Sequence, residues 1–149
     1  MNNNSSNKPY IPIPMGALAF YQGFFTLIML THYTTQDEFD KAGQKAVREG
    51  ALDSTQLEEE ERKAAIAFVE AFRQRKLKSA YTTLQSRSAF YTFYWRIATV
   101  ISYLPDSVID EAQSQAIKAG EIPAQNALSK AQIKELAELL AKMHMASMS

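Results

Sequence analysis

The longest apolar segment of the chain lies near its N-terminus, at residues 15–30, MGALAFYQGFFTLIML. It belongs to a run of 28 residues, 9–36, that contains no Asp, Glu, Lys or Arg. Small or weakly polar residues fall on one side of this segment at helical spacing, and large apolar residues cover the other sides. A helix that is apolar nearly all round lies in a protein core or in a membrane. The spacing of Ala19 and Gly23 also favours close approach of a second helix.

The length of this segment helps to decide between the two settings. As a helix, its 16 residues span roughly 24 Å, at about 1.5 Å per residue. The hydrocarbon core of a bilayer is about 30 Å thick and usually needs around 20 residues. A helix extended to residue 33 approaches this length, but it then includes His32. Gln22 already lies in the middle of the segment. We therefore predict a core helix covered by the later helices, with a membrane anchor at residues 15–33 as the alternative.

The next two segments carry helix-start signals. Thr35 and Glu38 form a capping-box pattern that predicts a helix over residues 36–49, which Gly50 ends. Thr55 and Glu58 repeat the pattern and predict the start of a third helix that continues to about residue 79. The apolar face of the second helix is predicted to include Val47. The third helix is predicted to turn four residues inward: Ala65, Phe68, Val69 and Phe72.

The second half of the chain predicts three more helices. Residues 89–104, AFYTFYWRIATVISYL, also favour strands, but 16 residues without a turn signal is long for a strand. Residues 79–88 form either a bend before this helix or part of one very long helix. Asp106 or Ser107 is expected to cap a short helix that ends before Gly120, and residues 121–127 form a linker. Ser129 with Gln132 is the clearest helix start in the chain.

These elements predict an all-α fold, a single-domain bundle of about five or six helices around the hydrophobic N-terminal helix. Residues 1–14 are expected to form a flexible or extended tail, residues 15–145 the helical domain, and residues 146–149 a frayed C-terminus. The composition agrees, since 46% of the residues are hydrophobic and 21% are charged, as in ordinary globular proteins. Cysteine is absent, which excludes disulfides and thiolate chemistry.

Catalytic motifs are missing from the sequence. The two histidines, His32 and His144, are far apart in sequence, and no Glu-x-x-His or His-Glu-x-x-His occurs. The five glycines are too scattered for a phosphate-binding loop, and no Gly-x-Ser-x-Gly is present. We therefore expect a protein that is not an enzyme and that uses neither a metal nor a cofactor.

Charge is distributed unevenly, although the formal net charge is zero. Residues 37–61 contain nine acidic and three basic residues, a net charge of −6. Residues 62–96 contain eight basic residues and one acidic residue, a net charge of +7. The simplest interpretation is two antiparallel helices of opposite charge that lie side by side, with surface pairs worth about 0–1 kcal/mol each. The alternative is a basic patch for an anionic partner.

The aromatic residues next to the basic segment suggest a binding surface. Tyr and Trp are favoured at protein interfaces because they combine a large apolar area with a polar tip. Tyr91 and Trp95 are therefore either core residues or exposed anchors for a partner. The predicted partner-binding residues are Arg73, Arg75, Lys76, Lys78, Tyr81, Arg87, Tyr91 and Trp95.

The leading functional prediction is a non-catalytic helical protein-interaction module, an adaptor, regulator or inhibitor, in the cytoplasm. The second is a membrane-associated protein anchored by residues 15–33, with a helical cytoplasmic domain. The third is a nucleic-acid-binding regulator that uses the basic helix at residues 62–96, although the sequence pI of about 6.7 is low for that class. The sequence identifies neither the partner nor the oligomeric state.

Overall fold

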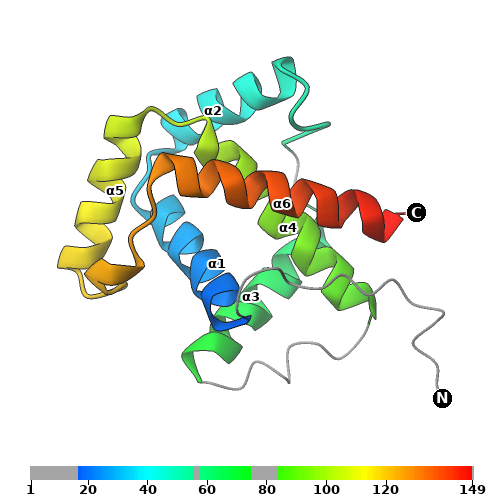
Figure 1. The fold of residues 1–149 in the computed structure, drawn as a ribbon, viewed down its shortest axis with the longest axis horizontal. Helices are drawn as coiled ribbons and strands as arrows, with labels where there is room; N and C mark the ends of the chain where they lie inside the picture. The colour runs from blue at the N-terminus through cyan, green and yellow to red at the C-terminus, as the bar shows by residue number, and fades with distance from the viewer. Residues whose placement is uncertain (1–16, 56–57, 75–83, 149) are drawn as a thin grey trace.

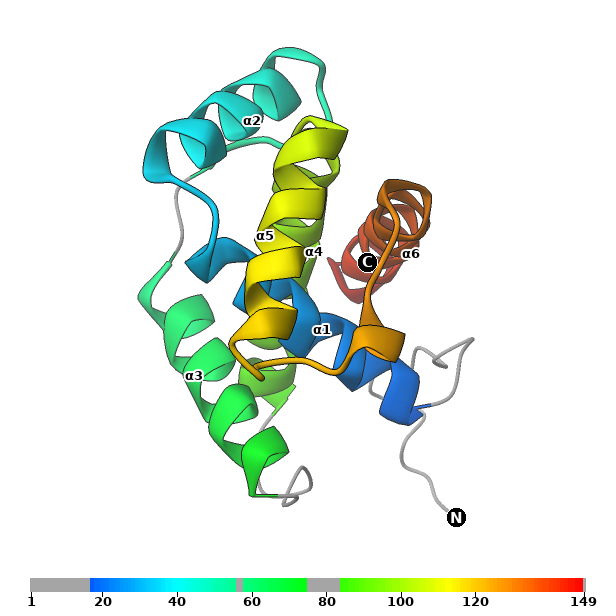
Figure 2. The ribbon, with the colours of Figure 1, turned by 90° about the vertical axis from the view of Figure 1, so that its left-hand side faces the viewer.

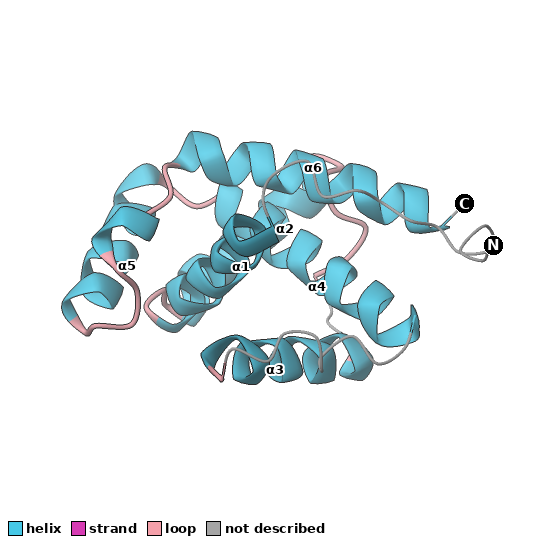
Figure 3. Ribbon diagram, turned by 60° about the horizontal axis from the view of Figure 1, so that its bottom comes forward, coloured by secondary structure: helices cyan, strands magenta, loops and turns pink. Residues whose placement is uncertain are grey.

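The computed structural model describes residues 17–55, 58–74 and 84–148 of the chain (Figure 1). All regular elements in this part of the chain are helical (Figure 3). They are α1 (Ala17–His32), α2 (Gln36–Arg48), α3 (Glu59–Arg73), α4 (Leu84–Ser102), α5 (Asp106–Lys118), the short 3₁₀ helix η3 (Ala124–Asn126) and α6 (Lys130–Met148). The predicted all-α bundle is confirmed.

Helix α1 lies in the interior of the bundle, as predicted. It contacts α3, α4, α5 and η3. Its large side chains Phe20, Leu27 and Leu30 are fully buried. The later helices therefore cover these side chains of α1. Within the described residues, none of the helices combines the length and the apolar character that crossing a bilayer requires.

The contact between α1 and α4 depends on the absence of a side chain at Gly23. The hydroxyl of Tyr94 on α4 donates a hydrogen bond of 2.7 Å to the carbonyl oxygen of Phe20. A Cβ atom at Gly23 would lie 3.0 Å from that hydroxyl oxygen and 3.4 Å from Cδ2 of Leu136 on α6. Three helices therefore meet at this glycine, which confirms the close approach predicted from its spacing with Ala19.

Aromatic rings fill the space between α1, α3 and α4. The ring of Phe90 is stacked on that of Phe68 on α3, with centroids 3.5 Å apart and planes inclined by 14°. On its α1 side, the same ring meets Phe24 edge to face at 4.7 Å. Such pairs contribute about 0.5–1.5 kcal/mol beyond the burial of their area. The aromatic stretch of α4 is therefore the centre of the hydrophobic core.

The predicted helix boundaries are confirmed where a side-chain cap or a glycine determines them. The Oγ1 atom of Thr35 accepts a hydrogen bond from the backbone of Glu38 at the start of α2. Ser129 and Gln132 form both hydrogen bonds of a capping box, at 3.1 and 2.8 Å. Gly50 and Gly120 have φ of +79° and +76°, the left-handed conformation that favours glycine after a helix.

Three predicted boundaries differ from the structure. Helix α3 is capped by Glu58 without a side-chain hydrogen bond, and Thr55 instead packs on α2, where its methyl group would be 2.8 Å from a Cβ at Gly43. The same helix ends at Arg73, before residue 79. Pro105, not Asp106 or Ser107, is the N-cap of α5, and its carbonyl accepts from the backbone N–H groups of residues 108 and 109.

Other predictions fall at the edges of the described residues. Helix α6 runs to Met148, beyond the limit predicted at residue 145. Helix α4 begins at Leu84, while the N-terminal tail at 1–14 and the possible bend at 79–83 lie outside the described residues. Within the described residues, the predicted inner face of α2 is wrong at Val47, which is 37% exposed.

Candidate functional site

The structure does not bring the described members of the predicted partner-binding set onto one surface. Arg73 is exposed at the end of α3, whereas Tyr91 and Trp95 on α4 are buried, with 9% and 8% of their surface exposed. Arg87 lies in α4, but its side chain is outside the described residues. The remaining four residues also lie outside them: Arg75, Lys76, Lys78 and Tyr81.

Packing inside the chain accounts for the two buried aromatic residues. The Tyr91 ring lies 5.6 Å from that of Phe90 and 6.2 Å from that of Phe20. The Trp95 ring is stacked on the imidazole of His144 on α6, with centroids 4.4 Å apart and an interplanar angle of 15°. These positions agree with the interpretation as core residues. Their contribution to partner binding stays a prediction.

His144 joins the C-terminal part of α6 to α4. Its Nδ1 atom lies 3.2 Å from the hydroxyl oxygen of Thr92, one helical turn before Trp95. Burial lowers the pKa of His144 below its ordinary value, and the nearby positive charge of Arg96 lowers it further. The contact between α4 and α6 therefore favours the neutral imidazole.

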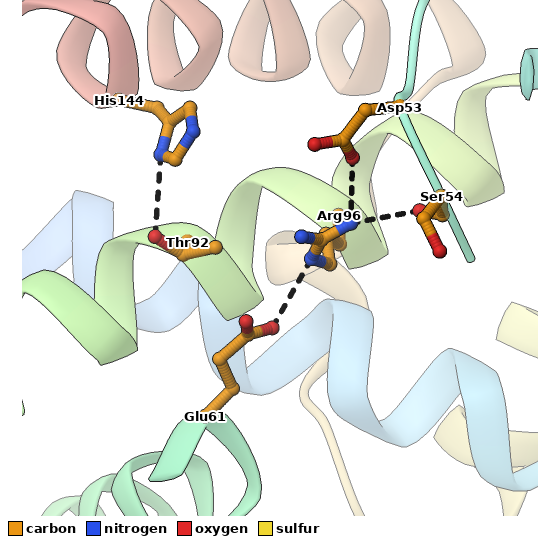
Figure 4. A network of polar contacts seen from close by, with 6 residues as sticks. All are labelled: Asp53, Ser54, Glu61, Thr92, Arg96 and His144. Carbon is orange, nitrogen blue, oxygen red and sulfur yellow. Dashed lines mark hydrogen bonds and ion pairs between the residues drawn. The ribbon is translucent and has the colours of Figure 1, made fainter. Parts of the chain in front are cut away.

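Arg96, the neighbour of Trp95, faces another side of α4 and is the centre of a polar network (Figure 4). Its Nε donates to Oε1 of Glu61 on α3 at 3.2 Å. Its Nη1 donates to Oδ1 of Asp53 at 3.1 Å and to the carbonyl oxygen of Ser54 at 2.7 Å. With only 12% of its side chain exposed, Arg96 fixes both α3 and the connection between α2 and α3 to α4.

The Arg96 network also tests the prediction of paired acidic and basic segments. Arg96 belongs to the basic segment, while Glu61 and Asp53 belong to the acidic one, so the two segments are joined inside the protein. Other ion pairs in these segments, such as Lys41 with Asp37, lie within one helix. Burial raises the pKa of Glu61 above its ordinary value, because it outweighs the lowering by Arg96.

A groove of about 870 Å³ lies between α2 and α3. Figure 2 shows these two helices apart from each other, α2 above and α3 below. The floor consists of apolar side chains from α4, α1 and the α2–α3 connection: Phe93, Ile97, Val100, Ile28, Met29 and Leu52. Polar groups lie around it, among them His32 at the end of α1, Gln44 and Asp40 on α2, and Arg62, Glu70 and Arg73 on α3. Arg96 also lines the groove, so its ion pairs fix the position of one part of the wall.

The wall formed by α3 carries the most exposed apolar side chain of the groove. Ile66 is 62% exposed, and Val69, three residues further along the helix, is half-buried. On the opposite wall, Phe39 is also half-buried. An accessible apolar edge beside an apolar floor is the arrangement of a surface that binds another apolar group.

Sequence reasoning did not identify this groove. Its walls come from α2 and α3, and nothing in the sequence specifies that these helices stand apart on α4. One signal was available at Ile66, a large apolar residue one position away from the inward stripe that contains Ala65 and Val69. An apolar residue that does not fit the buried face of its helix is a candidate for contact with a partner.

No cluster of three or more His, Asp or Glu side chains that could hold a metal ion occurs in the part of the chain that the structure describes. No protein-family model matches the chain, and comparisons with curated proteins and with solved structures give no match.

Proposed function

We propose that this protein is a non-catalytic interaction module that binds a protein partner in the groove between α2 and α3. The main supporting observation is Ile66, which is 62% exposed at the edge of an apolar floor. Complete burial of an isoleucine side chain is worth about 1.5–3 kcal/mol relative to exposure. A partner that covers Ile66 would gain part of this free energy.

The composition of the groove supports a protein as the partner. An apolar centre within a polar, solvent-accessible rim is the usual anatomy of a protein interface. The one charged residue next to the floor, Arg96, already has carboxylate partners in Glu61 and Asp53. A partner therefore meets no buried uncompensated charge there, which would be costly to cover.

This proposal moves the binding site away from the aromatic and basic face predicted from the sequence. Arg73 is common to both sites, whereas the buried Tyr91 and Trp95 are not needed. Nucleic-acid binding stays a prediction with less support, because Arg96 and Lys63 of the basic segment are ion-paired with carboxylates of this chain.

Site-specific photo-crosslinking in the native host tests the proposal. A photoreactive benzoylphenylalanine is introduced at Ile66 or Gln44 on the two walls of the groove. Matched controls carry it at the exposed neighbours Ala67 and Val47, which do not line the groove. We expect crosslinked protein adducts from the two wall positions and none from the two controls.

A second variant shows that the adducts depend on the groove. With the photoreactive residue at Gln44, Ile66→Glu should abolish the adducts, while Ala67→Glu should leave them. Adducts of equal yield from Ala67 and Val47, or adducts that persist in the Ile66→Glu protein, would place the partner elsewhere. Circular dichroism should show that all variants are folded, because both substituted residues on α3 are exposed.

A further inference from the structure

We infer that the groove binds an amphipathic helix of about three turns whose two polar flanks carry opposite charges. The acidic flank faces α3 and the basic flank faces α2. This inference rests on the proposed function, because it names the kind of protein segment that occupies the groove.

The shape of the walls determines the length of the bound segment. The α3 residues that line the groove, Arg62, Ala65, Ile66, Val69, Glu70 and Arg73, recur at helical spacing and form one face. From residue 62 to residue 73 this face is roughly 16 Å long, the length of about three helical turns. The residues of α2 that line the opposite wall, from Gln36 to Gln44, also recur at helical spacing. Two helical ridges with an apolar floor between them can receive the side-chain ridges of a third helix.

The backbone chemistry of the groove favours a helix over an extended peptide. An extended peptide needs hydrogen-bond partners for its own N–H and C=O groups, which a sheet edge supplies. Both walls and most of the floor are helices, whose backbone groups are already bonded within each helix. A helical segment bonds its own backbone and places only side chains on the floor, so no polar group is buried without a partner.

The α3 wall presents positive charge to the groove. Arg62 and Arg73 are both exposed, and neither forms an ion pair with another residue in the described part of the chain. The guanidinium carbon of Arg73 lies 5.4 Å from the centre of the Phe25 ring, which positions the head group without neutralising it. Glu70 lies between the two arginines in sequence, so this wall has a net charge of +1. Carboxylates on the bound segment complement Arg62 and Arg73 at the two ends of this wall.

The α2 wall presents the opposite charge. Asp40 is exposed, and its Oδ1 atom accepts a hydrogen bond of 2.8 Å from Nε2 of Gln36. It is the charged residue of α2 among those that line the groove, and it forms no ion pair with another described residue. A lysine or arginine on the bound segment complements this wall.

Opposite flanks also determine the direction of the bound helix. A helix with an apolar stripe can lie in the groove in two directions, which exchange its flanks between the walls. A helix with one acidic and one basic flank satisfies both walls in one direction only. A helix with two acidic or two basic flanks opposes one wall in either direction.

The test uses peptides selected against the folded full-length chain. Three display libraries of about 18-residue peptides share one helical pattern, because isolated helices shorter than about 12–15 residues are marginal in water. Their apolar stripe is varied among Leu, Ile, Met and Phe. The flanks are Glu and Lys in the first library, Glu and Glu in the second, and Lys and Lys in the third. The best binder is then resynthesised with all three flank sets, and each dissociation constant is measured by fluorescence anisotropy.

Each like-charged version loses an attraction at one wall and gains a repulsion there, and each of these two changes alters the binding constant by at most about fivefold. We therefore expect the Glu/Lys peptide to bind about tenfold more tightly than either like-charged version. The Ile66→Glu chain should lose binding and the Ala67→Glu chain should retain it. The Asp40→Lys chain should bind the Glu/Glu peptide more tightly than the Glu/Lys peptide. The bound peptide should also show helical circular dichroism.

Three other results would overturn the inference, and they are distinguishable from failure of the proposed function. Equal affinity of the three flank sets would remove the charge assignment. Selection of extended peptides only would remove the helix. If host crosslinks from Ile66 and Gln44 persist in the absence of any helical binder, the proposed function stands and the inference fails. If the host crosslinks and the helical binders are both absent, the proposed function and the inference both fail.

Discussion

Two sides of α4 differ in how completely other helices cover them. On the side that meets α1, α3 and α6, Phe90 and Tyr94 are fully buried, and a Cβ atom at Gly23 would lie only 3.0 Å from the Tyr94 hydroxyl. On the side that meets α2 and α3, Phe93, Ile97 and Val100 form the floor of a groove with the exposed Ile66 at its edge. The neighbours Trp95 and Arg96 belong to these two sides, one stacked on an imidazole and the other ion-paired.

This difference suggests that one helix supports both the stability of the fold and its binding surface, through different residues. Substitutions on the closed side should change the free energy of unfolding. Substitutions at the edge of the groove should change binding and leave the free energy of unfolding nearly constant.

The largest expected effect on stability is that of Phe90→Ala. Phe90 has no exposed surface, stacks on Phe68 and meets Phe24. Truncation of a buried phenylalanine typically costs about 3–5 kcal/mol, because it removes apolar contacts and leaves a cavity. For the matched comparison, Ile66→Ala on the exposed edge should change the free energy of unfolding by about 0.5 kcal/mol or less. Urea unfolding monitored by circular dichroism measures both values, and similar losses would contradict the distinction between the two sides.

The next effect is a coupling between Gly23 and Tyr94. In the wild-type chain, Gly23→Ala places a methyl group 3.0 Å from the Tyr94 hydroxyl, which is held by its hydrogen bond to Phe20. Overpacking of this kind costs about 1–3 kcal/mol, whereas alanine in a helix is favoured over glycine by about 1 kcal/mol. We therefore expect a net loss of stability of about 1 kcal/mol.

Removal of the hydroxyl should eliminate or reverse this loss of stability. In a Tyr94→Phe background the methyl group has space, so Gly23→Ala should be neutral or stabilising by up to about 1 kcal/mol. The double-mutant cycle from urea unfolding should therefore show a coupling of about 1–2 kcal/mol. Additive effects of the two substitutions would mean that the hydroxyl does not limit the space at Gly23.

Local signals account for the parts of the fold that sequence reasoning predicted correctly. The capping residues Thr35 and Ser129 act on backbone groups within three residues, so their patterns are readable in a single segment. The spacing of Gly23 and Ala19 predicted the close approach of a second helix for the same reason, because both residues lie in one segment. The partner of Gly23, Tyr94, is distant in the chain, and no local pattern specifies which helix approaches the glycine.

The candidate site could not be predicted because it depends on how helices are placed on one another. The basic segment reads as one charged surface, yet the Arg96 side chain turns inward to Glu61 and Asp53. In the sequence Trp95 resembles an interface anchor, whereas in the fold its ring stacks on His144 of α6. The groove exists because α2 and α3 pack on α4 with a space between them. The one sign of it in the sequence is Ile66, a large apolar residue outside the buried stripe of its helix.

The smallest effect concerns the pH dependence of the contact between α4 and α6. The folded chain lowers the pKa of His144, mainly through burial, so the unfolded chain binds a proton there more readily. The stability that this histidine contributes is therefore fully present above its ordinary pKa of about 6.5 and is lost as the pH falls through the lowered value. His144→Phe keeps a ring against Trp95 and removes the titration. Between pH 7.5 and 5.5, wild type should lose more stability than this variant.

Trp95 reports this contact directly, since it is the only tryptophan of the chain. Its fluorescence should be blue-shifted in the folded protein, and in wild type it should be quenched as the pH falls, when the stacked imidazole gains a proton. The His144→Phe protein should show no such change. Glu61 opposes this trend, because its raised pKa gives a contribution that is present at low pH and lost as the pH rises. The wild-type and variant chains share Glu61, so the difference between their pH profiles isolates His144. Identical profiles would mean that the imidazole is not held in the neutral form by the closed side of α4.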